Sequence, residues 1–293
     1  MIVGLLLAAL VLLGGIFLAA LVRAARERGQ LRPAREAIGL GAVTNFFDTL
    51  GIGSFAPTTA YVKLRALVPD SFIPATLNVG HCLPTVAQAL IFINLVRVDP
   101  LLLVACIAAA VAGAVMGAPV VVRLSLRAVQ AVVGVALLVA ASLYGMTNLG
   151  LMPGGGEALA LNGGLAAAAI AAHFAMGALM TFGIGLYAPS LVLLSLLGLN
   201  PTAAFPIMMG ACAFLMPVSG LRFMRTERVD LRVVIGMAVG GVPAVLLAAF
   251  VVKSLPLQTL RWGVVLVVLY SAGLLLRSAA RRTPVAAAEA LPS

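Results

Sequence analysis

An apolar segment interrupted by glycine and proline occurs twice in this chain. The sequence TLGIGSFAPTTAYVKL at residues 49–64 returns as TFGIGLYAPSLVLLSL at residues 181–196. Glycine opens backbone conformations that other residues avoid, and proline suits the first turn of a new helix, so each copy predicts a helix that breaks and restarts. Corresponding breaks in the two halves of a membrane protein are typical of a transporter's substrate site. The duplication therefore predicts two related halves with a binding site between their breaks.

The composition places the chain among polytopic helical membrane proteins. Hydrophobic residues make up 63% of the chain and charged residues 10%, and the mean hydropathy is +1.17, values far outside those of a soluble domain. The formal net charge of +10 comes from basic residues in short runs between apolar stretches, which indicates membrane topology rather than nucleic-acid binding. Three cysteines lie in apolar segments without CxxC or histidine partners, so we expect no disulfide framework, no metal site and no cofactor.

Seven segments besides the two motif segments are long enough to cross the hydrocarbon core of a bilayer. They are residues 1–22, 72–95, 100–122, 128–144, 202–221, 231–252 and 257–276. Each motif segment either crosses as one broken helix or re-enters and leaves on the side from which it came. Hairpins place 16 of the 19 Lys and Arg residues on the cytoplasmic side, whereas crossing segments place 13 there, so the positive-inside rule favours hairpins. Against hairpins, residues 163–182 are long enough to cross alone.

The expected fold is an all-α integral membrane protein with about seven transmembrane helices plus two re-entrant or broken helices in two inverted repeats. Three crossings per repeat invert the second copy, an arrangement common among secondary transporters. The expected parts are an N-terminal transmembrane helix and basic cytoplasmic loop (1–36), a first repeat (37–146), a linker (147–162), a second repeat (163–280) and a disordered tail (281–293).

An anion is the ligand that such breaks suit. A helix that starts in mid-membrane leaves backbone N–H groups without partners and carries a partial positive charge at that end, and an anion satisfies both. Polar residues cluster around both breaks and on one face of the span that follows the first. The expected substrate-binding residues are Asn45, Thr49, Gly51, Gly53, Ser54, Thr58, Asn78, Thr181, Gly183, Gly185, Tyr187 and Ser190. The alternative is that the glycines serve only close helix packing.

Asp48 and His81 are the candidates for proton coupling. Asp48 is the only acidic residue deep in an apolar segment, where a charged carboxylate is costly, and the alternative is an exposed position near the cytoplasmic mouth. His81 shares a polar helix face with Asn78, Thr85 and Gln88, and a histidine there acts either as a proton carrier or only as a hydrogen-bond partner. His173 is a weaker candidate for the same role.

The residues at the two breaks resemble the sulfite exporter TauE/SafE family. The resemblance rests on the duplicated Gly-rich segment, here Gly51-Ile52-Gly53-Ser54 and Gly183-Ile184-Gly185-Leu186, and on FIPATLNVG at residues 72–80. It extends from residue 38 to about residue 276 and implies transport of sulfite, sulfonates or related sulfur-containing or organic anions across the inner membrane. Ser54 and Leu186 depart from the family, which often has a third glycine at these positions.

Two other function classes are considered beside a permease. A passive anion channel would share the architecture. An intramembrane enzyme is the weaker alternative, because Ser54 and Leu186 stand where an aspartyl protease of the Gly-x-Gly-Asp type needs its acid. We expect a multi-pass protein of the cell inner (plasma) membrane whose partners are a small anion, protons and the lipid bilayer. The sequence leaves the substrate, the transport direction, the coupling ion and the oligomeric state open.

Overall fold

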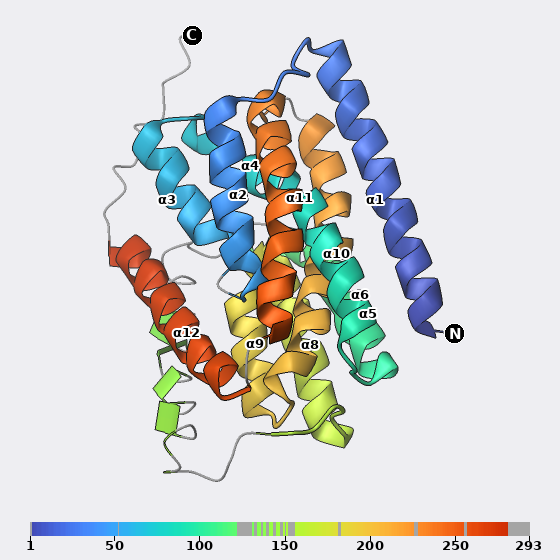
Figure 1. Cartoon of the computed structure of the whole chain (residues 1–293), viewed down its shortest axis with the longest axis vertical. Coiled ribbons are helices and arrows are strands. Elements are labelled where there is room, and N and C mark those ends of the chain that lie inside the picture. Colours follow the sequence, from blue (N-terminus) through green and yellow to red (C-terminus); the bar gives the residue numbers. More distant parts are fainter. Residues whose placement is uncertain are drawn as a thin grey trace.

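The chain folds into a bundle of helices (Figure 1). The computed structural model describes residues 2–51, 53–121, 156–180, 183–225, 228–254 and 257–280, together with scattered positions between 131 and 151. No strand occurs among these residues, in agreement with the all-α expectation. The helices are α1 (Ile2–Glu27), α2 (Arg35–Thr49), α3 (Phe55–Arg65), η1 (Asp70–Phe72), α4 (Ile73–Gly80), α5 (Cys82–Leu95), α6 (Pro100–Val121), α8 (Gly163–Met180), α9 (Tyr187–Leu196), α10 (Pro201–Arg225), α11 (Leu231–Ser254) and α12 (Leu257–Ala280).

Five helical segments in the described part of the chain are long and apolar enough to cross a membrane. They are Ile2–Glu27, Ile73–Leu95, Gly163–Met180, Pro201–Arg225 and Leu231–Val251. Helices α6 and α12 lie where two further spans were expected. The span expected at 128–144 falls on a stretch of which only scattered positions are described, and the expected tail at 281–293 lies outside the described residues. These helices make the chain a multi-pass membrane protein.

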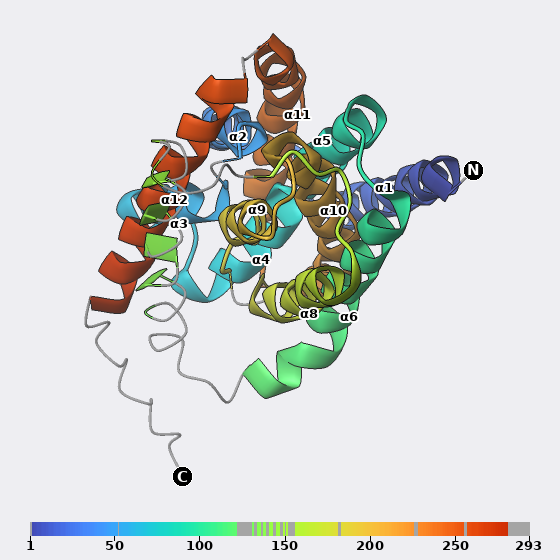
Figure 2. The same cartoon turned by 90° about the horizontal axis from the view of Figure 1, so that it is seen from below.

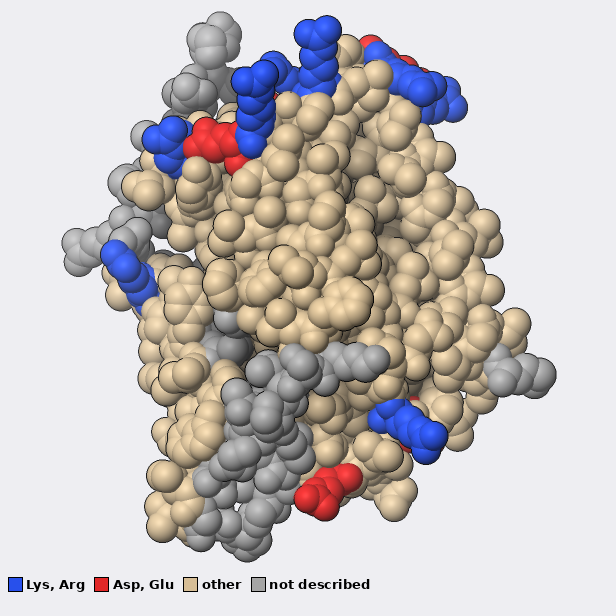
Figure 3. All heavy atoms as spheres, in the orientation of Figure 1, with Lys and Arg blue, Asp and Glu red and all other residues tan. Residues whose placement is uncertain are grey.

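Most charged side chains on the face shown lie toward the two ends of the molecule, and the surface between the ends is mostly uncharged (Figure 3). On the face shown, most Lys and Arg lie at the end where α1 ends and α2 begins, which we call the basic end. The Arg28 guanidinium donates to Met224 O at 2.6 Å there, and the Ala34 N–H donates to Arg232 O at 2.9 Å. We call the opposite end, where the Asp99 N–H donates to a loop carbonyl at residue 159, the far end. The positive-inside rule predicts that the basic end faces the cytoplasm.

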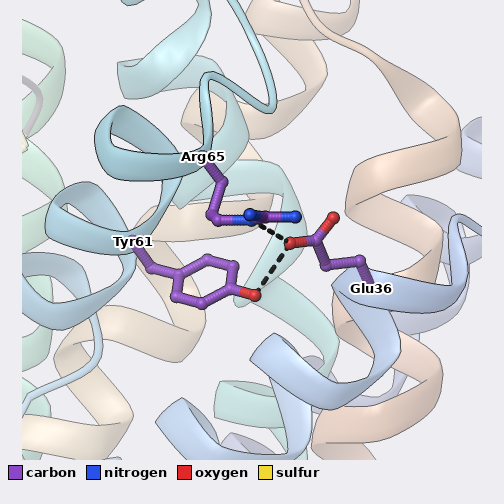
Figure 4. A network of polar contacts seen from close by, with 3 residues as sticks. All are labelled: Glu36, Tyr61 and Arg65. Atoms are coloured by element: carbon purple, nitrogen blue, oxygen red, sulfur yellow. Dashed lines mark hydrogen bonds and ion pairs between the residues drawn. The ribbon is translucent and has the colours of Figure 1, made fainter.

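Each motif segment forms a hairpin of two helices joined at its break. In the first hairpin, α2 starts and α3 ends at the basic end, where Glu36 accepts hydrogen bonds of 2.8 Å from Tyr61 and from Arg65 (Figure 4). In the second hairpin, α8 starts and α9 ends at the far end, where the Asn200 N–H donates to Ala158 O at 2.8 Å. The hairpins therefore enter the bundle from opposite ends, and both breaks lie in its interior.

The first arm of each hairpin packs against a helix of the other half. Helix α2 lies along α11, and α8 lies along α6. Glycines allow these pairs to approach closely: a Cβ on Gly240 would lie 1.9 Å from Ile38 O, and one on Gly177 would lie 2.0 Å from Ala110 O. Helix α10 packs against α4, α5 and α9, and Figure 2 shows α9 in the middle of the bundle. Helices α5 and α10 thereby form a central wall against which both breaks lie.

Helices α6 and α11, against which the first arms of the two hairpins pack, each have an aspartate at the N-cap position. Asp99 Oδ1 accepts a hydrogen bond of 2.7 Å from the Leu102 N–H at the start of α6, and Asp230 Oδ1 accepts one of 3.3 Å from the Val233 N–H at the start of α11. A carboxylate at this position satisfies a helix N–H that has no partner within the helix. Both acids are thus helix caps, and their common role extends the similarity of the two halves beyond the breaks.

Candidate functional site

The two breaks share a positive-φ glycine at the first of their two matching glycine positions. Gly51, Gly53 and Gly183 have φ values of +93°, +84° and +83°, which L side chains rarely adopt. The expectation of such a conformation was wrong for Gly185, which is not among the positive-φ residues. Ser54 occupies the N-cap position of α3, as expected, but its side chain makes no capping hydrogen bond. The helices α3 and α9 therefore both start inside the bundle without a side-chain cap.

A small cavity of about 20 Å³ lies between the two breaks. Its lining residues are Asp48, Gly53, Ser54, Phe55, Thr85, Met180, Gly185, Leu186, Tyr187, Cys212 and Met216. Four pairs of these residues occupy matching positions of the repeated segments: Asp48 with Met180, Gly53 with Gly185, Ser54 with Leu186, and Phe55 with Tyr187. A cavity of this volume holds a water molecule but no sulfite-sized anion. The site therefore has no room for such an anion in this structure.

Asp48 is buried at the wall of this cavity. Its side chain is 3% exposed, so the alternative of an exposed position near the cytoplasmic mouth was wrong. The Gln88 amide nitrogen donates to Asp48 Oδ2 at 3.0 Å and to Thr49 Oγ1 at 3.0 Å. Ser54, the N-cap residue of α3, lines the cavity beside Asp48. The chain thus places its own carboxylate at the start of α3.

Gln88 also contacts the second hairpin. The Tyr187 hydroxyl, at the first residue of α9, donates a hydrogen bond to Gln88 Oε1, and Thr85 lines the same cavity as Tyr187. Gln88, Asp48 and Tyr187 are all buried. One amide side chain on α5 therefore joins the carboxylate at the first break to the phenol at the second.

His81 is buried in a separate set of hydrogen bonds behind the first break. Its Nδ1 lies 2.9 Å from Asn45 Oδ1, and its Nε2 lies 2.9 Å from Thr58 Oγ1. The Asn45 amide nitrogen donates to Gly41 O at 2.7 Å, so Asn45 Oδ1 is left as an acceptor for the His81 Nδ1–H. Nε2 then accepts from the Thr58 hydroxyl, and this neutral histidine joins α2, α3 and the start of α5.

His173 makes the corresponding contact in the second hairpin. Its Nδ1 lies 2.8 Å from Ala169 O and its Nε2 lies 3.0 Å from Ser190 Oγ. A carbonyl oxygen can only accept, so Nδ1 carries the proton and Nε2 accepts from the Ser190 hydroxyl. Ser190 matches Thr58 in the repeat. Each hairpin is therefore closed by a hydroxyl on its second arm that donates to a buried histidine, although the two histidines come from different helices.

The expected site residues fall into three groups. Asp48, Gly53, Ser54, Gly185 and Tyr187 line the cavity. A second group does not line the cavity but makes hydrogen bonds beside the breaks or forms their backbone: Asn45, Thr49, Gly51, Thr58, His81, Gly183 and Ser190. Asn78 is buried on α4 and donates to Pro74 O at 2.9 Å, away from the cavity lining. Thr181 lies outside the described residues.

Sequence reasoning missed part of the lining. Phe55, Met180, Leu186, Cys212 and Met216 line the cavity, and apolar or sulfur side chains gave no signal of a polar site. A signal for Cys212 was available, because Gly210-Ala211-Cys212 matches Gly80-His81-Cys82 just beyond the breaks. No Lys or Arg is among the lining residues that the structure describes.

The second hairpin and the helices after it correspond to a known family of membrane transporters. Residues 165–292 match the sulfite exporter TauE/SafE family. This match covers most of α8, then α9 to α12, and confirms the resemblance for the second half of the chain, including the Gly183 break. TauE/SafE proteins are transporters rather than enzymes. Comparison with curated proteins and with solved structures gave no match.

Proposed function

We propose that this chain is a secondary transporter that carries a small anion across the inner (plasma) membrane, with its substrate site between the two breaks. The anion is sulfite, a sulfonate or a related sulfur-containing or organic anion, the substrate class that the TauE/SafE match suggests. The observation that carries the proposal is the cavity itself, since Gly53 to Phe55 from one half and Gly185 to Tyr187 from the other half line the same space.

The two hairpins are re-entrant in this proposal. The first would enter the membrane from the cytoplasmic side and the second from the outside, because their open ends lie at the basic end and the far end of the bundle. The reciprocal pairs α2 with α11 and α8 with α6 support two inverted repeats, and inverted repeats place the substrate near the membrane midplane.

The anion would be held without a basic side chain. Helices α3 and α9 start at the cavity, so their first N–H groups and the positive ends of their dipoles face it. A site built from backbone dipoles and hydroxyl groups binds less tightly than one with Arg or Lys, which suits release on the other side of the membrane.

Asp48 would couple transport to protons. A carboxylate beside the start of α3 satisfies the same N–H groups that an anion would use, and its charge repels that anion. Protonation of Asp48 removes the repulsion, so a proton and an anion would bind together. His81 would act as a hydrogen-bond partner that holds the first hairpin closed.

The experiment that tests this function is flux into proteoliposomes of the purified chain. A panel of sulfite, methanesulfonate and small carboxylates would be measured with and without a pH gradient. The proposal expects saturable uptake of a sulfur-containing anion that an imposed proton gradient drives. A large unitary conductance without proton coupling would show a channel instead, and the absence of flux for every anion in the panel would contradict the proposed function.

A further inference from the structure

We propose that Gln88 is a positioning residue that links the two breaks. When Asp48 is protonated, the Gln88 amide turns and leaves the Tyr187 hydroxyl at the second break free to donate a hydrogen bond to the anion. This inference rests on the proposed transport function. It concerns one amide that has a partner on each hairpin: Asp48 with Thr49 on the first, and Tyr187 on the second.

The orientation of the Gln88 amide depends on the charge of Asp48. An ionised carboxylate can only accept hydrogen bonds, so the amide nitrogen must face Asp48 and the amide oxygen must face Tyr187. The observed contacts have this orientation: Nε2 donates to Asp48 Oδ2 at 3.0 Å, and Oε1 accepts from the Tyr187 hydroxyl. Gln88 is fully buried, so water cannot replace either partner.

This orientation makes the cavity unfavourable for an anion in two ways. The Asp48 carboxylate presents a negative charge at the cavity wall. The Tyr187 hydroxyl gives its only proton to Gln88, so its oxygen, rather than its hydrogen, is left for the cavity. An anion needs donors, and the ionised state offers it only the backbone N–H groups at the two helix starts.

A proton on Asp48 releases both constraints. The neutral carboxyl group has an O–H that can donate to Gln88 Oε1, so the amide can turn over and exchange the positions of its oxygen and nitrogen. Nε2 then donates to the Tyr187 oxygen, and the Tyr187 hydrogen is free to point at an anion in the cavity. One proton is taken up at Asp48 for each anion bound, and both are released together.

Few other titratable groups face Asp48. They are Tyr187 on α9 and the Cys212 thiol on α10, and α5 contributes the uncharged Gln88. His81 bonds to Asn45 and Thr58 rather than to Asp48. Among the described residues, Tyr187 and Cys212 are thus the titratable side chains beside Asp48, and a Cys212→Ala variant tests whether the thiol shapes the pH response.

The experiment measures the affinity of the purified chain for methanesulfonate, an anion whose charge does not change between about pH 5.5 and about pH 8, so that only the protein titrates. The wild-type chain should bind more tightly at acid pH. Tyr187→Phe should weaken binding about tenfold at acid pH and less than about twofold at alkaline pH, since it removes one hydrogen bond to a charged ligand. Gln88→Met should tighten binding at alkaline pH, because the Tyr187 hydroxyl no longer donates its hydrogen to the Gln88 amide oxygen and can donate it to the anion.

The double variant should have the pH profile of Tyr187→Phe alone, because Gln88 acts through Tyr187. Asn94→Ala is the matched control on α5, since its exposed side chain bonds to Leu90 O on the same helix. Equal weakening of Tyr187→Phe at both pH values would overturn the proposal, and this variant alone decides it if Gln88→Met does not fold. A wild-type chain that carries neither sulfite nor methanesulfonate in proteoliposomes would contradict the proposed function instead.

Discussion

The two hairpins share a backbone and differ in chemistry. Gly51 and Gly183 match in sequence and in their positive φ, and α3 and α9 both start at the cavity. At the lining positions that match, the first hairpin has Asp48 and Ser54, whereas the second has Met180 and Leu186. The comparison indicates that the breaks build a site that is symmetric in shape, while a single carboxylate makes one half responsive to protons.

The largest expected effects come from the feature that the hairpins share. Gly51→Val and Gly183→Val should each abolish flux in proteoliposomes, because φ values of +93° and +83° cost an L residue about 1–2 kcal/mol and more for a β-branched one. Gly39→Ala on α2 is the control, because Gly39 lacks a positive φ and a Cβ there would meet no atom within 4 Å. Normal flux in both valine variants would show that the breaks serve packing alone.

Asp48→Asn tests the feature that separates the hairpins. The amide mimics the protonated carboxyl group, so the variant should bind substrate at acid and alkaline pH and lose the response of flux to an imposed pH gradient. Met180→Leu at the matching position should leave that response intact. An Asp48→Asn protein that still follows the pH gradient like the wild-type chain would eliminate Asp48 as the coupling residue.

A smaller effect should follow from removal of the hydroxyls that close the hairpins. Thr58→Ala and Ser190→Ala each leave a buried histidine Nε2 without its donor, a loss of about 1–3 kcal/mol of stability. Both should lower the thermal unfolding temperature by similar amounts. Ser142→Ala, which removes only an exposed hydroxyl bonded to Leu138 O, should change it little. A large loss in one hairpin and none in the other would show that only one of the two closures matters.

The smallest effect concerns Glu36 at the open end of the first hairpin (Figure 4). Hydrogen bonds from Arg65 and Tyr61 lower the pKa of the Glu36 carboxyl group below its ordinary value near 4.5. A lowered pKa in the folded state stabilises the fold above the ordinary pKa, and this stabilisation is lost as the pH falls through the lowered value. Glu36→Gln should therefore reduce the unfolding temperature slightly at neutral pH and not at all in strong acid. The same difference at both pH values would refute an ionic contribution.

The sequence predicted the parts of the fold that depend on the repeated motif and on the length of the apolar segments. Two matching Gly-Pro breaks and the apolar spans follow from where these residues lie along the chain, whereas the sequence left a buried and an exposed Asp48 as alternatives and the structure decided between them. The contacts of Glu36 with Tyr61 and Arg65 bring the start of α2 and the end of α3 together, and whether the hairpin re-enters the membrane, as the basic-residue count favours, stays a prediction.

The sequence could not predict which polar residues meet. Gln88 and Tyr187 are 99 residues apart, and nothing in the pattern of either helix indicates that they bond to each other. The sequence also could not predict that Met180 and Met216 line the cavity, because a methionine at the cavity and one in the core have the same local sequence pattern. Such pairs follow from how α5, α9 and α10 cross, and that crossing depends on packing between distant segments.

The most direct test of two hairpins that enter from opposite sides is side-specific labelling of single cysteines. A chain without Cys82, Cys106 and Cys212 would carry Cys at Ala66, just after α3, or at Leu197, just after α9. In sealed vesicles of known orientation, a membrane-impermeant thiol reagent should label Ala66→Cys only from the cytoplasmic side and Leu197→Cys only from the outside. Labelling of both positions from the same side would contradict the inverted arrangement on which the shared site depends.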